Sequence, residues 1–530
     1  AIKWDNGNWV MRYPIGLSVL FSPFYFIADL LVRFTDYPAD GFSKPYQVSI
    51  LCGCLLYTLV GLYFVKKVLI NFFNDKIAAV TLVCITLGTN YFFHVCIHGN
   101  GAMSHNILFT LYAIILYLTI KWHTSFKTKH IVLLAICVGL TALCRASEII
   151  CVLIPLFYGV LNWNGFKQKL QLLVRYKIQL LLFSFLILCI GSLQFIYWKY
   201  SSGHFVINPY GAGNPGEGFE LSNPHILKVL FSFRKGWLVY TPIMIFTLAG
   251  FWHLYKNNKN LFTPVVIYFI INFYIVSSWS CWWYGGCYGV RALVPAYALL
   301  ILPFGYFIEH MIKSKLKYLY YSVMLLFVFL NLFQTWQMSA YIMDPANMSR
   351  AYYFSTFLQT SIPTHEQTKL LLKGKFNNGV DVFTSEDSAT HSLNYAKLVN
   401  FENETNANFL GTEFKHSGRY SLITNIKNPS TPIISVMHKD ITKKSYTWIK
   451  ASVWVYSNYP ADSLNAFFVI HMKHNGYIFK GKEYKLSAEN FKPNMWNKLE
   501  YYYLTPDDLR STKDEVCIYF INKTKHTIYV

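Results

Sequence analysis

Long apolar runs separated by short polar segments fill the first two thirds of the chain. A membrane-spanning helix needs about 20 mostly apolar residues, because the hydrocarbon core is about 30 Å thick and a helix rises about 1.5 Å per residue. By this criterion the pattern predicts about ten spans. They lie at 47–66, 77–96, 106–121, 130–144, 147–162, 178–198, 236–255, 262–280, 289–308 and 318–337. The fourth and fifth are short, and we expect them to form a tight hairpin around Arg145.

The pattern changes after the last apolar run. Residues 341–380 are mixed and polar and are predicted to be a linker. Beyond them, apolar and polar positions alternate with a period of two, as in the run YTWIKASVWVY, and turn residues separate the runs. Short strands at regular spacing indicate an antiparallel sandwich. The sequence therefore predicts a polytopic α-helical membrane body over 47–340, followed by an all-β sandwich domain over 381–530.

The composition is that of a membrane protein. Of 530 residues, 54% are hydrophobic and 14% charged, and the mean hydropathy is +0.30, so the chain is too apolar for an ordinary soluble enzyme. The formal net charge of +21 also raises the alternative of nucleic-acid binding. A nucleic-acid-binding protein gathers its Lys and Arg on one face of a soluble domain, whereas many lie here in short loops between apolar runs. We expect a lipid bilayer as a partner and no nucleic acid.

The basic loops determine the predicted orientation. Lys and Arg are concentrated in alternate loops, which the positive-inside rule places in the cytoplasm. These loops are 66–67, 121–129, 167–177, 256–259 and 313–317. The outward loops are then 97–105, 145–148, 199–235, 281–288 and everything after 338. The β domain is therefore predicted to be extracytoplasmic.

This alternation conflicts with the apolar stretch 14–34. If 47–66 runs inward, the residues before it are outside, and 14–34 is not a simple span unless residues 1–12 are cytoplasmic. We predict that 1–46 is an outward juxtamembrane segment, with its aromatic rings at the outer membrane face. The chain begins at Ala1 without a signal peptide, and we expect a first transmembrane helix to precede it.

Ionisable residues at the outward ends of the spans are candidates for function, because each costs about 2.5–3.5 kcal/mol to insert into a membrane. They are His98, His105, Arg145, Glu148, Arg234, Lys235 and Arg291. Each has a structural alternative. Arg145 and Glu148 lie three apart and could neutralise each other. The histidines could be ordinary loop residues, and the Arg234–Lys235 pair could be interfacial cations. Clustering on one side predicts an outward-facing polar cavity.

Arg291 is the hardest of these to explain as structure, because it follows the glycines of SSWSCWWYGGCYGVRALVP at 277–295. Its planar guanidinium can bind phosphate oxygens bidentately, and glycines let backbone N–H groups approach an anion. Aromatic rings give a sugar or an isoprenoid a surface to stack on. The aromatic residues predicted to line the cavity are Trp279, Trp282 and Tyr284. The combination suits a lipid-linked phosphate at the membrane surface.

Cysteines and short motifs narrow the chemistry further. The sequence has no CxxC pair, HExxH, Walker loop or GxSxG elbow, which argues against zinc, nucleotide or serine-hydrolase chemistry. Cys281 and Cys287 share an outward loop and could pair in an oxidising compartment, but spacing alone does not decide this.

Four segments carry a family resemblance. They are KWDNGNWVMRYPIGLSVLFSPFYFIA at the start, GLTALCRASEIICVLIP at 139–155, FSFRKGWLVYTP at 231–242 and WWYGGCYGVRALVPAYALL at 282–300. Together they resemble the GT-C superfamily of polytopic glycosyltransferases, of the polyprenyl-phosphate-sugar-dependent kind that includes protein O-mannosyltransferases and aminoarabinose transferases. The resemblance implies inverting-type transfer of a sugar from a polyprenyl-phosphate-linked donor to a cell-envelope acceptor, a glycan, lipid or protein. The reaction would take place at the outer face of the bacterial inner membrane.

The resemblance also implies roles for residues. In such enzymes a carboxylate in the first outward loop acts as the base or positions the acceptor hydroxyl, and cations hold the leaving phosphate. Arg291 and the pair Arg234 and Lys235 would be the donor phosphate-binding residues, with Arg145 as a further one. Asp5 is the candidate catalytic base, unless the true base precedes Ala1. The family includes metal-dependent and metal-independent members, so no cofactor is assigned and a divalent metal stays open.

The C-terminal region has a resemblance of its own. HSGRYSL at 416–422, the strand from Trp448 to Trp454, WNKL at 496–499 and DEVCIYF at 514–520 are similar to jelly-roll carbohydrate-binding modules. We expect the sandwich to be truncated in its last strand. The two tryptophans share a sheet face because their separation is even. That face could stack on sugars or belong to the core.

Two other functional classes fit part of the pattern. A transporter or flippase for lipid-linked sugars also needs an aromatic, arginine-bearing cavity. Inverted repeats are common in secondary transporters, and the sequence shows none. A non-catalytic membrane anchor for a glycan-binding sandwich needs only the spans and leaves the outward charges unexplained. The transferase is therefore favoured.

Overall fold

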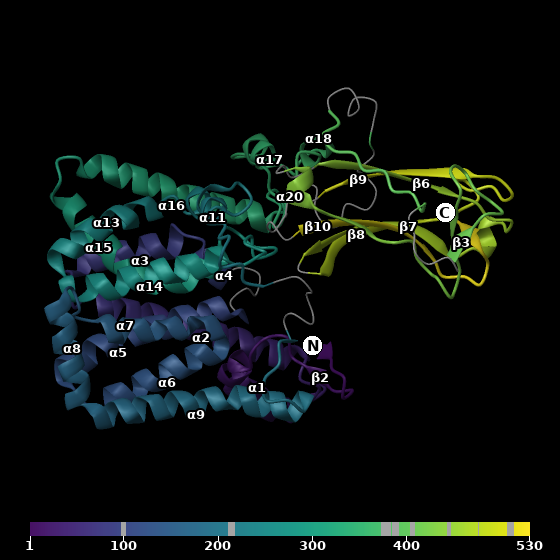
Figure 1. The fold of residues 1–530 in the computed structure, drawn as a ribbon. Coiled ribbons are helices and arrows are strands. Elements are labelled where there is room, and N and C mark those ends of the chain that lie inside the picture. Colours follow the sequence, from purple (N-terminus) through teal and green to yellow (C-terminus); the bar gives the residue numbers. More distant parts are fainter. Residues whose placement is uncertain are drawn as a thin grey trace. The chain divides into compact units, whose positions relative to one another are not determined.

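The computed structural model describes residues 1–96, 102–209, 218–372, 383, 392–402, 409–442, 447–474, 476–505 and 514–530. The chain divides into two compact units. The first, which we call the helical unit, comprises residues 1–213 and 218–371 (Figure 1). The second, the β unit, comprises residues 372–530 with the short segment 214–217.

The described helices of the helical unit follow a short hairpin of β1 (Ile2–Lys3) and β2 (Trp9–Val10). In chain order they are α1 (Gly16–Val32), α2 (Lys44–Leu69), α3 (Asp75–Leu87), α4 (Tyr91–Cys96), α5 (Ser104–Ser125), α6 (Thr128–Cys144), the 3₁₀ helix η2 (Ala146–Val152), α7 (Leu153–Phe157), α8 (Trp163–Arg175), α9 (Lys177–Ser202), α11 (Ile226–Phe231), α12 (Trp237–Tyr240), α13 (Met244–Asn257), α14 (Lys259–Ser277), the 3₁₀ helix η3 (Arg291–Ala296), α15 (Tyr297–Lys313), α16 (Lys317–Ser339), α17 (Arg350–Ser355) and α18 (His365–Thr368).

Within the described residues, six helices are long and apolar enough to cross a membrane: α2, α5, α9, α14, η3 with α15, and α16. The predicted count of about ten spans is not confirmed. Three of the predicted runs are interrupted. The run 77–96 breaks between α3 and α4 after Gly88, and 236–255 breaks at Pro242, which lacks the N–H that a helix needs. The run 147–162 forms only η2 and the five-residue α7.

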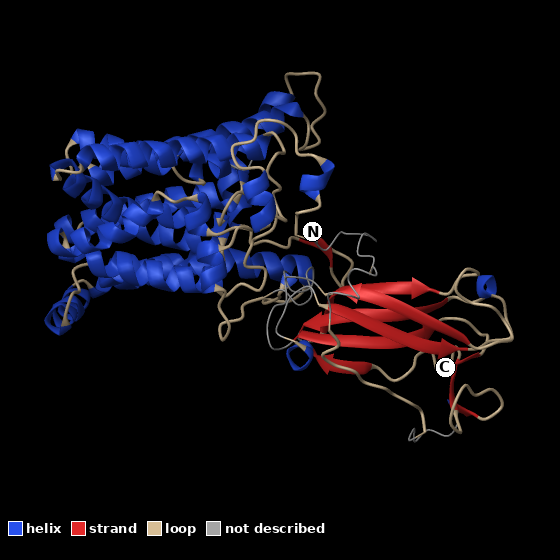
Figure 2. Cartoon of the chain, turned by 90° about the horizontal axis from the view of Figure 1, so that it is seen from above, coloured by secondary structure: helices blue, strands red, loops and turns tan. Residues whose placement is uncertain are grey.

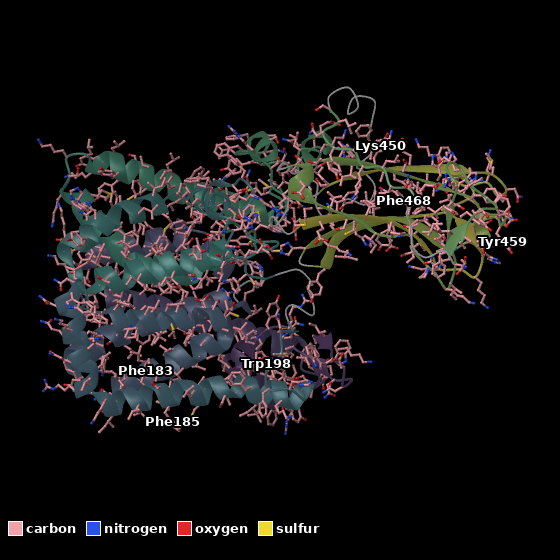
Figure 3. The ribbon with its side chains drawn as sticks, viewed as in Figure 1. Phe183, Phe185, Trp198, Lys450, Tyr459 and Phe468 are labelled. Carbon is pink, nitrogen blue, oxygen red and sulfur yellow. The ribbon has the colours of Figure 1, made fainter. Side chains whose placement is uncertain are left out.

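The helical unit has a buried centre and an apolar periphery. In the apolar window of η3 and α15, 94% of residues are buried, against 11% in α9. Gly250 lets α13 touch α15, since a Cβ there would overlap the carbonyl of Pro303. On α9, Phe183 is buried and Phe185 is 62% exposed (Figure 3). The outer faces of such helices are suited to lipid.

Helix α1 packs lengthwise against α2. The Tyr57 hydroxyl donates to the carbonyl of Leu20 at 2.7 Å, and the Ser49 hydroxyl donates to that of Phe24 at 2.6 Å. A residue later in α1 therefore contacts a residue earlier in α2, so the two helices run antiparallel. Polar side chains of α2 thus bind α1 along its length, and the predicted position of 1–46 at the outer membrane face stays a prediction.

Part of the predicted linker is folded. Within 341–380, α17 and α18 form, and Tyr352 and Tyr353 are buried against Tyr240 and Tyr288 of the helical unit. These aromatic rings supply enough apolar surface to pack the segment.

The β unit is an antiparallel two-layer structure (Figure 2). Its described strands are β3 (Leu410–Gly411), β4 (Ser421–Thr424), β5 (Ile434–Met437), β6 (Trp448–Val455), β7 (Ala466–His474), β8 (Tyr477–Lys485), β9 (Asn497–Leu504), β10 (Asp514–Asn522) and β11 (Ile528–Tyr529), with short helices α20 (His438–Ile441) and η5 (Ala461–Ser463). One sheet has the order β5-β10-β7-β8. The sheets β11-β4-β3 and β6-β9 meet through a bridge between Tyr456 and Tyr529. Apolar residues of β6 and β9 pack against those of β7 and β10, such as Phe468. These strands agree with the predicted sandwich class.

Candidate functional site

Three segments far apart in sequence converge at one end of the helical unit. Ser104 and His105 begin α5, Arg145 connects α6 to η2, and Arg291 begins η3. Arg145 has an extended backbone between two helices (φ −156°, ψ 118°). This extended residue ends α6 and lets its side chain turn toward α5.

Arg145 is held by an ion pair and a hydroxyl. Its Nη1 donates to Glu148 Oε1 at 3.2 Å, and its Nη2 donates to Ser104 Oγ at 3.0 Å. The second oxygen of Glu148, a residue only 4% exposed, accepts from the Tyr112 hydroxyl at 2.7 Å. The ion pair of Arg145 with Glu148, one of the two alternatives for these residues, is present. Charge balance does not exclude a ligand, because the Arg145 side chain keeps 30% of its surface exposed.

Arg291 lies in a different environment. Its contact among the described residues is a long one, from Nη1 to the thioether sulfur of Met103 at 3.6 Å. A thioether is a weak acceptor, so most of the guanidinium donors stay available. A Cβ on Gly285 would stand 4.0 Å from Arg291 Nη2, and Gly285 has φ +71°, a conformation that favours glycine. The glycine-rich loop therefore passes beside the guanidinium.

A buried histidine lies near these cations. His105 is 3% exposed, and its Nδ1 finds no hydrogen-bond partner in the described part of the chain. It directly follows Met103 and Ser104, which contact Arg291 and Arg145. The His94 ring centroid is 6.3 Å away, with Nε2 at 2.8 Å from the carbonyl of Tyr288. A buried imidazole nitrogen without a partner beside two guanidiniums is a place where an anion fits.

Arg234 and Lys235 have a different role in the structure. The Lys235 ammonium is 1% exposed and donates to the carbonyls of Cys287 and Pro345. Burial lowers the pKa of Lys235, and the nearby Asp344 carboxylate opposes that shift. The Arg234 guanidinium lies 4.0 Å from the centre of the Trp283 ring. The pair thus fixes the loop after α14 to the segment after α16, and its predicted phosphate binding would require these contacts to be released.

The predicted aromatic residues lie in the same loop but serve packing. Trp282 is buried, Trp279 contacts Phe219 with ring centroids 4.9 Å apart, and the Tyr284 hydroxyl donates to the carbonyl of Val276 at 2.8 Å. Their packing holds in place the loop that leads to Arg291.

The remaining sequence predictions concern Asp5, His98 and the pair Cys281 and Cys287. Asp5 is exposed in the turn of the N-terminal hairpin, which is tied to α9 by a hydrogen bond from Asn6 to Ser201 at 3.0 Å. His98 lies outside the described residues. Cys281 and Cys287 are not joined by a disulfide. Across the described ranges, no group of three or more His, Cys, Asp or Glu is arranged to hold a metal.

Sequence reasoning missed three contributors to the cluster, namely Met103, Ser104 and Tyr112. Ser104 had a local signal, since it precedes His105 at the start of an apolar run. Tyr112 reads as an ordinary core aromatic, and only the fold brings it to Glu148.

The outward face of the β unit is a second candidate surface. Trp448 and Trp454 share that face, as predicted, and point away from the core, which is filled instead by Ala451 and Val455. The His416 ring stacks on Trp454 with centroids 3.9 Å apart. A sugar stacking on Trp454 from that side would have to displace this histidine.

The sequence matches no protein-family model and no curated protein. Its function is therefore inferred from the residues themselves.

Proposed function

We propose that this protein transfers a sugar from a polyprenyl-phosphate-linked donor to a cell-envelope acceptor, with inversion, at the outer face of a bacterial inner membrane. One observation carries the proposal. Arg291, whose guanidinium has only a thioether contact among the described residues, lies with Arg145 and His105 at one end of an apolar helical unit, and His105 Nδ1 has no partner among those residues. An anionic head group attached to a hydrocarbon chain has the chemistry for such a place.

The reaction would be a single displacement. The acceptor oxygen bonds to the anomeric carbon, the bond from that carbon to the phosphate oxygen breaks, and the lipid phosphate leaves with the electron pair. Arg291 and Arg145 would stabilise the charge that develops on the leaving phosphate. Glu148 would act as a positioning residue, because its carboxylate orients Arg145. Asp5 is the proposed base for the acceptor proton.

The experiment is transfer of radiolabelled sugar from undecaprenyl-phosphate donors by membranes that carry the protein. We expect Arg291→Ala to lower transfer by at least about a hundredfold, as for removal of one donor that stabilises a transition-state oxyanion. Arg291→Lys should retain part of the activity. Lys129→Ala, an exposed residue of a predicted cytoplasmic loop, is the matched control. Transfer that is unchanged by Arg291→Ala, or absent with every donor, would refute the proposal.

A further inference from the structure

The surface of helix α8 has three sectors. It has thirteen residues and lies across the end of the bundle, at a steep angle to α9 (Figure 1). One sector faces the protein, one is apolar and exposed, and one is polar and exposed. A helix with an exposed apolar sector beside a polar one is typical of a membrane interface.

The protein-facing sector is anchored by Lys169. This residue is 5% exposed, and its Nζ lies 2.5 Å from His123 Nε2, 2.8 Å from the carbonyl oxygen of Pro155 and 3.3 Å from that of Tyr158. His123 Nδ1 lies 2.7 Å from the carbonyl of Thr119, which assigns the ring proton to Nδ1 and leaves Nε2 as an acceptor. All three ammonium protons are thus used, and the rotation of α8 about its axis is fixed.

With that rotation fixed, an apolar stripe is left uncovered. Trp163, Leu170 and Val174 are 67%, 46% and 71% exposed. Their spacing of seven and then four residues places them on one line along the helix. Since these are large apolar side chains, water is an unfavourable environment for the stripe.

Lys167 borders this stripe, and Arg175 lies at the end of the helix. Lys167 is exposed, with its Nζ 5.8 Å from the centre of the Trp163 ring. Arg175 is also exposed and lies over the ring of Tyr176. These cations stand beside apolar surface, as side chains do where acyl chains meet phosphate head groups.

The apolar stripe continues into α9. Only Tyr176 separates the two helices, and Ile178 and Leu181 on α9 are 76% and 70% exposed. α9 is also long and apolar enough to cross a membrane. A helix that joins such a span at its end and lies across it comes to rest at the depth of the head groups.

We propose that α8 is an interfacial helix that inserts Trp163, Leu170 and Val174 among lipid chains and binds acidic phospholipid head groups through Lys167 and Arg175. This inference does not depend on the proposed transfer reaction. Lys167 on the border of the stripe and Arg175 at the end of the helix favour an acidic lipid surface over a protein partner as the occupant.

The test uses the full chain reconstituted in phosphatidylcholine vesicles that contain phosphatidylglycerol. Trp163→Phe is a conservative change, so the fluorescence difference between the native protein and this variant isolates Trp163. We expect lipids brominated near the head-group end of their chains to quench most of this difference signal, and aqueous iodide to quench little of it. Brominated phosphatidylglycerol should quench more than brominated phosphatidylcholine at equal mole fraction, by about fivefold for each basic side chain. In Lys167→Gln/Arg175→Gln that preference should disappear.

Three results would overturn the inference. Quenching by iodide but not by brominated lipid would place Trp163 in water. Protection from both quenchers would mean that protein covers the stripe. Equal quenching by the two brominated lipids would remove the acidic head group as the ligand.

Discussion

Lys235 in the helical unit and Lys450 in the β unit hold their charges in opposite ways. In the helical unit Lys235 is 1% exposed and donates to backbone carbonyls. In the β unit, Lys450 and Lys498 share the carboxylate of Glu500 at 2.9 and 3.1 Å, with 57% and 47% of their side chains exposed. A buried charge must be compensated or several kcal/mol are lost, whereas an exposed pair contributes little. The buried charge of Lys235 is therefore informative about structure, while the exposed pairs of Glu500 are solvated.

The largest expected effect on stability comes from removing the ammonium group of Lys235. In Lys235→Met the carbonyls of Cys287 and Pro345 lose their donor and Asp344 loses a neighbouring cation. We expect the free energy of unfolding to fall by about 3–5 kcal/mol, measured by thermal unfolding in detergent micelles.

Lys450→Met is the matched control for Lys235, since it removes the same charge from an exposed pair. We expect it to leave stability nearly unchanged, because solvent screens the exposed pair. Equal losses in the two variants would show that burial does not separate the two lysines in this way.

The next effect distinguishes the two cluster arginines. Arg291→Ala should weaken donor binding by roughly ten- to a hundredfold, since a hydrogen bond to a charged group contributes about 1.5–3 kcal/mol. It should leave thermal stability within about 0.5 kcal/mol because the side chain has only a thioether contact in the described chain. Arg145→Ala should lower both the affinity for the donor and the thermal stability, because it leaves the buried Glu148 without its cation.

Isothermal titration with an undecaprenyl-phosphate sugar, paired with thermal unfolding, measures both quantities. If Arg291→Ala destabilises the protein as strongly as Arg145→Ala does, Arg291 is part of the structure and not a ligand-binding group.

The sequence predicted features that depend on local pattern. Apolar run length identified α2, α5, α9, α14, α15 and α16 because it is a one-dimensional property. The pairing of Arg145 with Glu148 was also readable, since the residues lie three apart. The contact between Arg291 and Met103 joins positions 188 residues apart, and no local pattern encodes it.

Local sequence likewise does not determine which face of a strand is buried. An even spacing placed Trp448 and Trp454 together, but which face forms the core depends on the opposing sheet. There Phe468 and other large residues of β7 fill the space, so that the small Ala451 suffices on β6 (Figure 3). The interruption at Pro242, in contrast, has a physical cause that is visible in the sequence.

A smaller, local effect is expected at Lys169, a buried cation at the other end of the helical unit. Lys169→Met removes the donor to Pro155, Tyr158 and His123. Unpaired acceptors cost about 2 kcal/mol, so hydrogen exchange of the α8 amides should become about thirtyfold faster. Gln168→Met, on the exposed side of the same helix, is the control. Exchange that is unchanged in Lys169→Met would show that packing alone holds α8.

The smallest effect is expected at Glu500, on the exposed side of the comparison. Hydrogen bonds from Lys450 and Lys498 lower the pKa of Glu500 to about 2 from its usual 4.5. Because the folded state binds the proton less readily than the unfolded state, this pairing contributes stability above pH 4.5 that is lost as the pH falls toward 2. The difference in unfolding free energy between the native protein and Glu500→Gln, measured by thermal unfolding at several pH values, should be at most about 1 kcal/mol near neutrality, since solvent screens the pair. It should vanish at low pH. A difference of several kcal/mol would mean that the exposed pairs of Glu500 are as consequential as the buried charge of Lys235, and the contrast between them would fail.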